Sequence, residues 1–166
     1  MSEDSVNVQI QRIYISSGHD FKGRHGRERL NHGSESVELV NCVMGKGLEG
    51  DRFFGYRDNF KGQITFMDRR VVDDLQDFLN LDDFDASQVR RNVLIDGIDL
   101  NSLIGCEFEL DGVRFSGSEE CAPCYWMDQA VGPGSEDFMK GKGGLRCRIL
   151  STGTLSVGIS KLSILG

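Results

Sequence analysis

The sequence predicts a mainly β domain, a barrel or sandwich with one or two short helices, from three observations. Short segments in which every second residue is apolar recur along the chain, as half-buried strands require. The pair Asp111-Gly112 separates two such segments and suits the positive φ angles of a type I′ hairpin turn. The 166 residues include 21 glycines and only 2 prolines, which indicates many tight turns between strands.

The strands can be placed in order along the chain. The apolar residues of 6–15 change phase near Gln11 and Arg12, which predicts a long strand with a β-bulge there. The Asp111-Gly112 turn joins strands at 108–110 and 113–115, and a second hairpin is expected around 151–154. The other expected strands are 37–43, 63–67, 93–95, 146–150, 155–157 and a closing strand at 162–164.

One amphipathic helix of about three turns is expected after Asp68, a suitable N-cap. Apolar residues recur with helical spacing from Val71 to Leu79, and the acidic side chains between them form a solvated face. No internal repeat or composition shift divides the chain. We therefore expect a single domain spanning residues 1–166.

The charge balance limits the classes of partner. The chain has 19 basic and 26 acidic residues, a net charge of −7, which argues against binding nucleic acid or an anionic membrane over a broad surface. A local anion pocket remains compatible with that balance. The first residues lack the features of a secretory signal, and no run approaches the roughly 20 apolar residues of a membrane helix. A cytoplasmic location is expected.

Cysteine provides the first candidate chemistry. Five cysteines at wide spacings are expected to be thiols in a reducing compartment, and two of them form Cys121-Ala122-Pro123-Cys124. Such a pair can be a redox couple, half of a zinc site, the source of one thiolate for a soft metal, or two buried apolar side chains. Zinc would need two further ligands, and a thioredoxin-type site would need a βαβ unit that the surrounding pattern does not predict.

Three basic segments provide candidate anion contacts. Arg90-Arg91-Asn92 directly precedes a predicted strand, where its donors can hold a phosphate or a carboxylate or bind nothing specific. In Gly50-Asp51-Arg52 the arginine faces either its neighbouring aspartate or a ligand. Residues 16–36 hold Lys22, Arg24 and all three histidines without apolar periodicity, as in a long surface loop that is either functional or simply solvated.

Taken together, these segments resemble a MOSC domain, the family named after the C-terminal domain of molybdenum cofactor sulfurase. The resemblance extends from about residue 6 to residue 158, and the order and spacing of the motifs carry it together. The segments concerned are Gly47-Leu48-Glu49-Gly50-Asp51-Arg52-Phe53-Phe54-Gly55, Gln63-Ile64-Thr65-Phe66, Arg90-Arg91-Asn92-Val93, Gly105-Cys106-Glu107-Phe108, Cys121-Ala122-Pro123-Cys124 and residues 144–158.

The resemblance implies a MOSC-type β-barrel that binds the pterin form of the molybdenum cofactor. In such proteins the second cysteine of Cys-x-x-Cys ligates the metal, and an Arg-x-Asn motif helps to hold the pterin and its phosphate. A thiolate suits a sulfur-rich molybdenum centre, and nearby arginines would lower the pKa of that thiol. The expected metal ligand and catalytic residue is Cys124, and the expected cofactor contacts are Arg90, Asn92, Arg52, Cys121, Lys22 and Arg24.

The sequence departs from the amidoxime-reducing members of that family. They carry a lysine and a serine near the end of the first strand, where this chain has Ser16-Ser17-Gly18. They also carry an arginine directly before the metal-ligating cysteine, a place taken here by Pro123. The loop that contains Lys22 and Arg24 is therefore expected to contact the cofactor phosphate in a different way.

Two functions follow from the resemblance. The first is a molybdenum-dependent reductase of N-hydroxylated compounds, with electrons from a separate donor protein because the chain shows no flavin, haem or iron–sulfur pattern. The second is a carrier without turnover, which holds sulfur as a persulfide on Cys124 or passes the cofactor to another enzyme. The reductase would bind molybdopterin as its cofactor, whereas persulfide carriage would need no bound cofactor.

Overall fold

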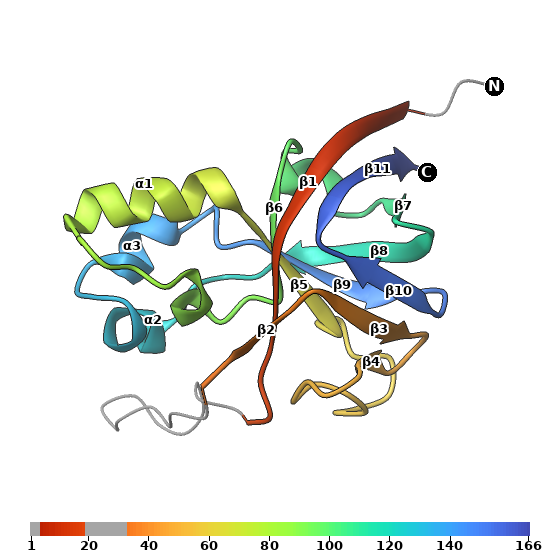
Figure 1. Cartoon of the computed structure of the whole chain (residues 1–166), viewed down its shortest axis with the longest axis horizontal. Coiled ribbons are helices and arrows are strands. Elements are labelled where there is room, and N and C mark those ends of the chain that lie inside the picture. Colours follow the sequence, from red (N-terminus) through yellow and green to blue (C-terminus); the bar gives the residue numbers. More distant parts are fainter. Residues whose placement is uncertain (1–3, 19–32) are drawn as a thin grey trace.

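A closed β-barrel forms the body of the protein in the computed structural model, which describes residues 4–18 and 33–166 (Figure 1). The strands are β1 (Asp4–Ile15), β2 (Glu35–Val37), β3 (Leu39–Val43), β4 (Gly47–Leu48), β5 (Ile64–Asp68), β6 (Val93–Asp96), β7 (Glu107–Leu110), β8 (Val113–Glu120), β9 (Leu145–Ile149), β10 (Gly153–Ser156) and β11 (Gly158–Ile164). The helices are α1 (Arg69–Leu79), α2 (Tyr125–Ala130) and α3 (Ser135–Met139), with 3₁₀ turns η1 (Ala86–Val89) and η2 (Leu100–Leu103).

Strand order shows how the barrel closes. Hydrogen-bonded neighbours follow the order β11-β7-β8-β9-β5-β6-β1, and β1 pairs again with β11, so the seven strands leave no open edge between them. The predicted closing strand is therefore confirmed. Strand β2 extends the far end of β1, and β10, β3 and β4 form a second, three-stranded sheet.

The bulge predicted in the first strand is confirmed and has a clear cause. The pairing of β1 with β6 shifts register between Ile10 and Arg12. Without this extra residue, Ile10 and Ile13 would point to opposite faces of the strand, because side chains alternate with a period of two. Both side chains are fully buried in the core, so the bulge aligns the two apolar phases of β1.

Two clusters of buried side chains stabilise the domain. Inside the barrel, the rings of Phe66, Phe108 and Phe115 pack against one another with centroids 5.5 to 6.1 Å apart. A second cluster, which includes Leu75, Met127 and Met139, joins the helices to the outer face of β5 and β6. The three α-helices lie together on one side of the barrel (Figure 1).

The fold class is confirmed, with one more helix in the described residues than expected. Helix α1 matches the predicted helix, and the Asp68 carboxylate accepts a hydrogen bond from the backbone N–H of Arg70. Helices α2 and α3 have six and five residues. Such lengths are too short for an apolar period of 3.6 residues to be recognised in the sequence.

One predicted hairpin is confirmed and the other is wrong. Asp111 and Gly112 have φ angles of 53° and 81°, as a type I′ turn between β7 and β8 requires. The second hairpin does not form, because β9 pairs with β5 and β8 whereas β10 pairs with β3. Leu155 of β10 packs in the core beside Val40 of β3, and apolar alternation alone cannot identify that partner.

The one parallel pair among the named strands positions the segment that matters most for the site. Strands β5 and β6 are parallel and are joined by α1 and η1. The crossover ends at Arg90, a non-glycine residue with a φ of 61°, which turns the chain from η1 into Arg91, Asn92 and β6. On the neighbouring strands, Thr65 lies opposite Arg146, and Arg146 lies opposite Glu119.

Gly117→Ala should destabilise the barrel by about 1–3 kcal/mol or more, because a Cβ at this position of β8 would overlap the Leu103 carbonyl group. Gly132→Ala is the matched control, since its Cβ would meet only the end of the Leu79 side chain, at 3.4 Å. Thermal unfolding followed by circular dichroism measures both variants. Equal melting temperatures for Gly117→Ala and the wild type would contradict the described packing of β8 against η2.

Candidate active site at the arginine-lined cavity

A cavity of about 190 Å³ brings both cysteines of Cys-x-x-Cys together with four arginines. Its lining residues are Arg52, Phe53, Phe60, Gly62, Thr65, Arg90, Arg91, Cys121, Ala122, Cys124 and Arg146. Of the sequence-predicted residues, Arg52, Arg90, Cys121 and Cys124 line it, and Asn92 does not line it but bonds to Thr65, which does. Lys22 and Arg24 lie outside the described residues.

The Cys124 thiol is partly exposed at the beginning of α2. Cys124 is the N-cap residue and its side chain makes no capping hydrogen bond. Burial raises the pKa of the Cys124 thiol, and the opposing effects of the Trp126 and Met127 N–H groups and of Arg91 are smaller. Arg91 lowers the pKa of this thiol, as expected of a nearby arginine, but desolvation outweighs its charge and the pKa is raised overall.

Arg91 fixes the path of the Cys-x-x-Cys segment. Its guanidinium Nη2 donates to the Cys121 carbonyl at 2.9 Å, its Nε donates to Gly143 at 2.8 Å, and its Nη1 donates to Val89 at 3.0 Å. Cys121 itself is buried. All three acceptors are neutral carbonyl oxygens. The buried positive charge of Arg91 therefore lies beside the cavity with its hydrogen bonds satisfied, and none of these three contacts is to a carboxylate.

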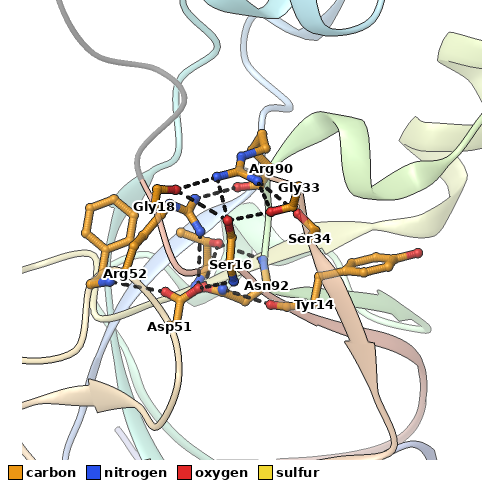
Figure 2. A network of polar contacts seen from close by, with 11 residues as sticks. Tyr14, Ser16, Gly18, Gly33, Ser34, Asp51, Arg52, Arg90 and Asn92 are labelled. Carbon is orange, nitrogen blue, oxygen red and sulfur yellow. Dashed lines mark hydrogen bonds and ion pairs between the residues drawn. The ribbon is translucent and has the colours of Figure 1, made fainter. Parts of the chain in front are cut away.

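Arg90 lines the cavity but directs its donors into the protein, as Figure 2 shows. Its Nη1 donates to the Gly33 carbonyl at 3.1 Å and to the Ser34 hydroxyl at 2.9 Å. Its Nη2 donates to the Ser16 hydroxyl at 3.0 Å and to the Gly18 carbonyl at 2.8 Å. These four bonds use all four terminal N–H groups of the guanidinium, which thereby joins the chain before residue 19 to the chain after residue 32.

Asn92 is a cross-link between strands. Its Oδ1 accepts from the backbone N–H of Thr65 at 3.0 Å and from the Thr65 hydroxyl at 3.1 Å. Its Nδ2 donates to the Tyr14 carbonyl at 3.1 Å (Figure 2). The side chain is buried and links β5 to β1. Both of its polar atoms, Oδ1 and Nδ2, are engaged in these hydrogen bonds.

Asp51 and Arg52 form the structural ion pair that was one of the two interpretations of Gly50-Asp51-Arg52. The buried Asp51 carboxylate accepts from the Ser16 N–H at 3.0 Å and from Arg52 Nη1 at 3.1 Å. Arg52 Nη2 donates to the Arg90 carbonyl at 3.3 Å, and its guanidinium lies 4.8 Å from the centre of the Phe53 ring. Arg52 thus helps to hold the cavity wall together through these contacts, and it also lines the cavity.

Sequence reasoning did not assign Arg146 or the aromatic wall to the site. Phe53, Tyr56 and Phe60 form a cluster with ring centroids 5.0 to 5.4 Å apart, and two of its rings line the cavity. Their spacing of three and four residues was a local signal of such a cluster. Arg146 had no such signal, because an arginine that alternates with apolar residues on a strand is typical of any solvent-facing position.

The described residues contain no group of three or more His, Cys, Asp and Glu side chains that could hold a metal ion by themselves. No helix in the described part of the chain is long and apolar enough to span a membrane.

Comparison with known proteins supports the same fold. A model of the MOSC domain family matches residues 29–160. The YuaD protein from Bacillus subtilis is 15% identical, with a TM-score of 0.79 and coverage of 99% of this chain and 100% of that chain. YiiM from Geobacillus stearothermophilus is 18% identical, with a TM-score of 0.67 and coverage of 96% and 75%. YiiM from Escherichia coli is 18% identical, with a TM-score of 0.63 and coverage of 96% and 68%. A search of curated proteins finds no match.

Asn92→Ala should lower the free energy of unfolding by about 1–3 kcal/mol, because it leaves the buried Thr65 N–H and the Tyr14 carbonyl without their partner. Asn101→Ala removes one exposed hydrogen bond to Gly141 and should have little effect. Urea unfolding measures both changes. An unchanged midpoint for Asn92→Ala would mean that this side chain does not hold β5 to β1.

Iodoacetamide should label Cys124 and Cys106 in the native protein and leave the buried Cys42, Cys121 and Cys147 unmodified. Labelling of Cys124 should accelerate as pH rises from 7 to 9, because its raised pKa leaves little reactive thiolate at neutral pH. Peptide mass spectrometry gives the labelled fraction at each cysteine. Protection of Cys124 equal to that of Cys147 would show that the cavity does not expose this sulfur.

Proposed function

Because the chain belongs to the MOSC domain family, which is associated with molybdenum-cofactor binding, we propose that it binds the pterin form of this cofactor at the cavity around Cys124. One observation carries the proposal: a partly exposed thiol and four arginines line the same cavity. In a chain with a net charge of −7, this gathering of positive charge provides a local site for an anionic ligand.

The donor set fits the chemistry of that cofactor. A thiolate is a soft ligand, suited to a metal that already carries sulfur ligands, and guanidinium groups suit phosphate oxygens. The volume of about 190 Å³ is below the roughly 300–1,000 Å³ of pockets that enclose whole small-molecule ligands. The cavity therefore accommodates one end of such a cofactor. The rest of the cofactor would extend beyond the space that the described residues enclose.

Each residue of the site has a separate task in this proposal. Cys124 would supply the thiolate, because a metal ion that bound its sulfur would displace the proton despite the raised pKa of the thiol. Arg91 places positive charge beside the sulfur and, through the Cys121 carbonyl, keeps the Cys-x-x-Cys segment in position. Arg90, Asn92 and Arg52 act by holding the cavity wall. Lys22 and Arg24 are candidate phosphate contacts from the sequence alone.

As an enzyme, the protein would reduce the N–O bond of an N-hydroxylated compound. The bound cofactor supplies oxygen-atom transfer chemistry for such a step. The overall change takes two electrons and two protons, breaks the N–O bond and releases the amine and water. A separate electron-donor protein must provide the electrons. Phe53 and Phe60 contribute apolar surface to the cavity wall.

The carrier function differs in what it demands of Cys124. Persulfide transfer needs an exposed thiol of low pKa and no metal, whereas burial raises the pKa of this thiol. Metal content therefore separates cofactor binding from persulfide carriage.

Cys124→Ser should abolish retention of molybdenum when the protein is produced in a host that makes the cofactor, since serine offers no soft ligand. Cys106→Ser is the matched control, because Cys106 is also partly exposed but does not line the cavity. Metal analysis by mass spectrometry and pterin analysis by fluorescence give the content of each protein. Wild type without molybdenum but with sulfane sulfur on Cys124 would refute the proposal and support the carrier.

A further inference from the structure

Arg146 differs from the other cavity arginines in how little of its guanidinium is engaged. Its described hydrogen bond joins Nη1 to Glu119 Oε1 over 3.4 Å, a long contact for an ion pair. Its side chain is 34% exposed, against 10% for that of Arg52. The residue nevertheless lines the cavity and sits on β9, a central strand of the barrel with neighbours on both sides.

The other three arginines already have structural partners at the wall. Arg52 is paired with the Asp51 carboxylate, and Arg90 is bonded to the chain on both sides of residues 19–32. Arg91 uses all three of its nitrogens on backbone carbonyls. A ligand that recruited any of these groups would have to break bonds in the wall, and a buried polar group without a partner is costly.

Glu119 is an exchangeable partner for Arg146. Its carboxylate is 42% exposed and is also paired with Lys61 at 3.0 Å, a shorter contact than the one to Arg146. When a ligand anion takes the place of Glu119 on Arg146, Lys61 and solvent still neutralise that carboxylate. The exchange therefore leaves no buried charge unpaired.

We propose that Arg146 is the residue that binds an anionic oxygen group of the ligand, a phosphate or a group of like charge and shape, in the Cys124 cavity. The planar guanidinium can donate two parallel hydrogen bonds to such a group. Because β9 is held on both sides, the Arg146 backbone needs no rearrangement on binding. This inference rests on the proposed function, since it assigns the anion contact of the same cavity.

The chain supplies its own control. Lys61 carries the same charge as Arg146 and contacts the same carboxylate, but it does not line the cavity. Arg146→Met and Lys61→Met therefore remove one positive charge each and one partner of Glu119 each. Glu119→Gln removes the competing carboxylate while leaving Arg146 in place.

The test measures molybdenum and pterin retained per chain after each variant is produced in a cofactor-making host and washed with inorganic phosphate. Loss of charge-assisted hydrogen bonds should reduce affinity about tenfold to a hundredfold in Arg146→Met. Arg146→Lys should recover part of this loss, because lysine keeps the charge but not the paired geometry. Lys61→Met should retain as much cofactor as the wild type, and Glu119→Gln as much or more.

The outcomes separate this inference from the proposed function. Cofactor in the wild type with equal retention by Arg146→Met refutes the role of Arg146 and leaves the proposed function intact. No cofactor in the wild type refutes the proposed function itself. Equal losses in Arg146→Met and Lys61→Met would show a general effect of charge and would also overturn the assignment. Circular dichroism confirms that each variant is folded.

Discussion

Burial of two adjacent arginines before β6 is the constraint on which the site depends. Arg90 and Arg91 are each only 7% exposed, and a buried guanidinium is stable only when its N–H groups are bonded. The chain meets this demand by bringing carbonyl groups from distant segments to these two residues. Gly18 and Gly33 converge on Arg90, and Gly143 and Cys121 converge on Arg91. The position of the cavity wall is thus largely set by hydrogen-bond satisfaction.

This constraint also explains why the cavity is positive in an acidic protein. Most charged side chains of the molecule lie at the surface, where solvent screens them. The net charge is therefore informative about solubility and says little about the charge at any one site. The arginines at the cavity act over short distances in a less polar surrounding, where a single charge has a larger effect. The three described partners of Arg91 are neutral carbonyl oxygens, so none of these contacts offsets its positive charge beside the cavity. The bonds that hold the wall therefore also affect the electrostatics of the site.

How much the sequence could predict depended on whether a feature was local. The bulge in β1 was visible because two apolar phases meet within one strand, and the Asp111-Gly112 turn was visible because its backbone angles restrict the residues allowed there. The partner of β10 was not visible, because alternation marks a strand without naming its neighbour. Cys124 could be selected from its motif, but the direction of its pKa shift depends on burial that only the folded chain defines.

The arginines show the same limit in a sharper form. A short motif can indicate that Arg90 and Asn92 matter, but it cannot distinguish a ligand contact from a residue that holds the wall. That distinction depends on where their donors point. Arg146 was passed over for the opposite reason, since nothing in its local sequence separates it from an ordinary strand arginine. Only its neighbours on the adjacent strands, among them Thr65, place it in the wall of the cavity that Cys124 also lines.

The close contact between Gly143 and the Cys-x-x-Cys segment helps to position Cys124 at the cavity. A Cβ at Gly143 would overlap the Cys121 carbonyl and would lie 2.8 Å from the Pro123 ring. Glycine lets the two segments approach closely enough for Arg91 to donate to both of their carbonyls. Pro123, which cannot donate a backbone hydrogen bond, fits this approach because its ring packs against the space that the glycine leaves. The path of the chain into Cys124 is therefore constrained at Cys121 and Pro123, where the missing side chain of Gly143, just before β9, allows the close approach.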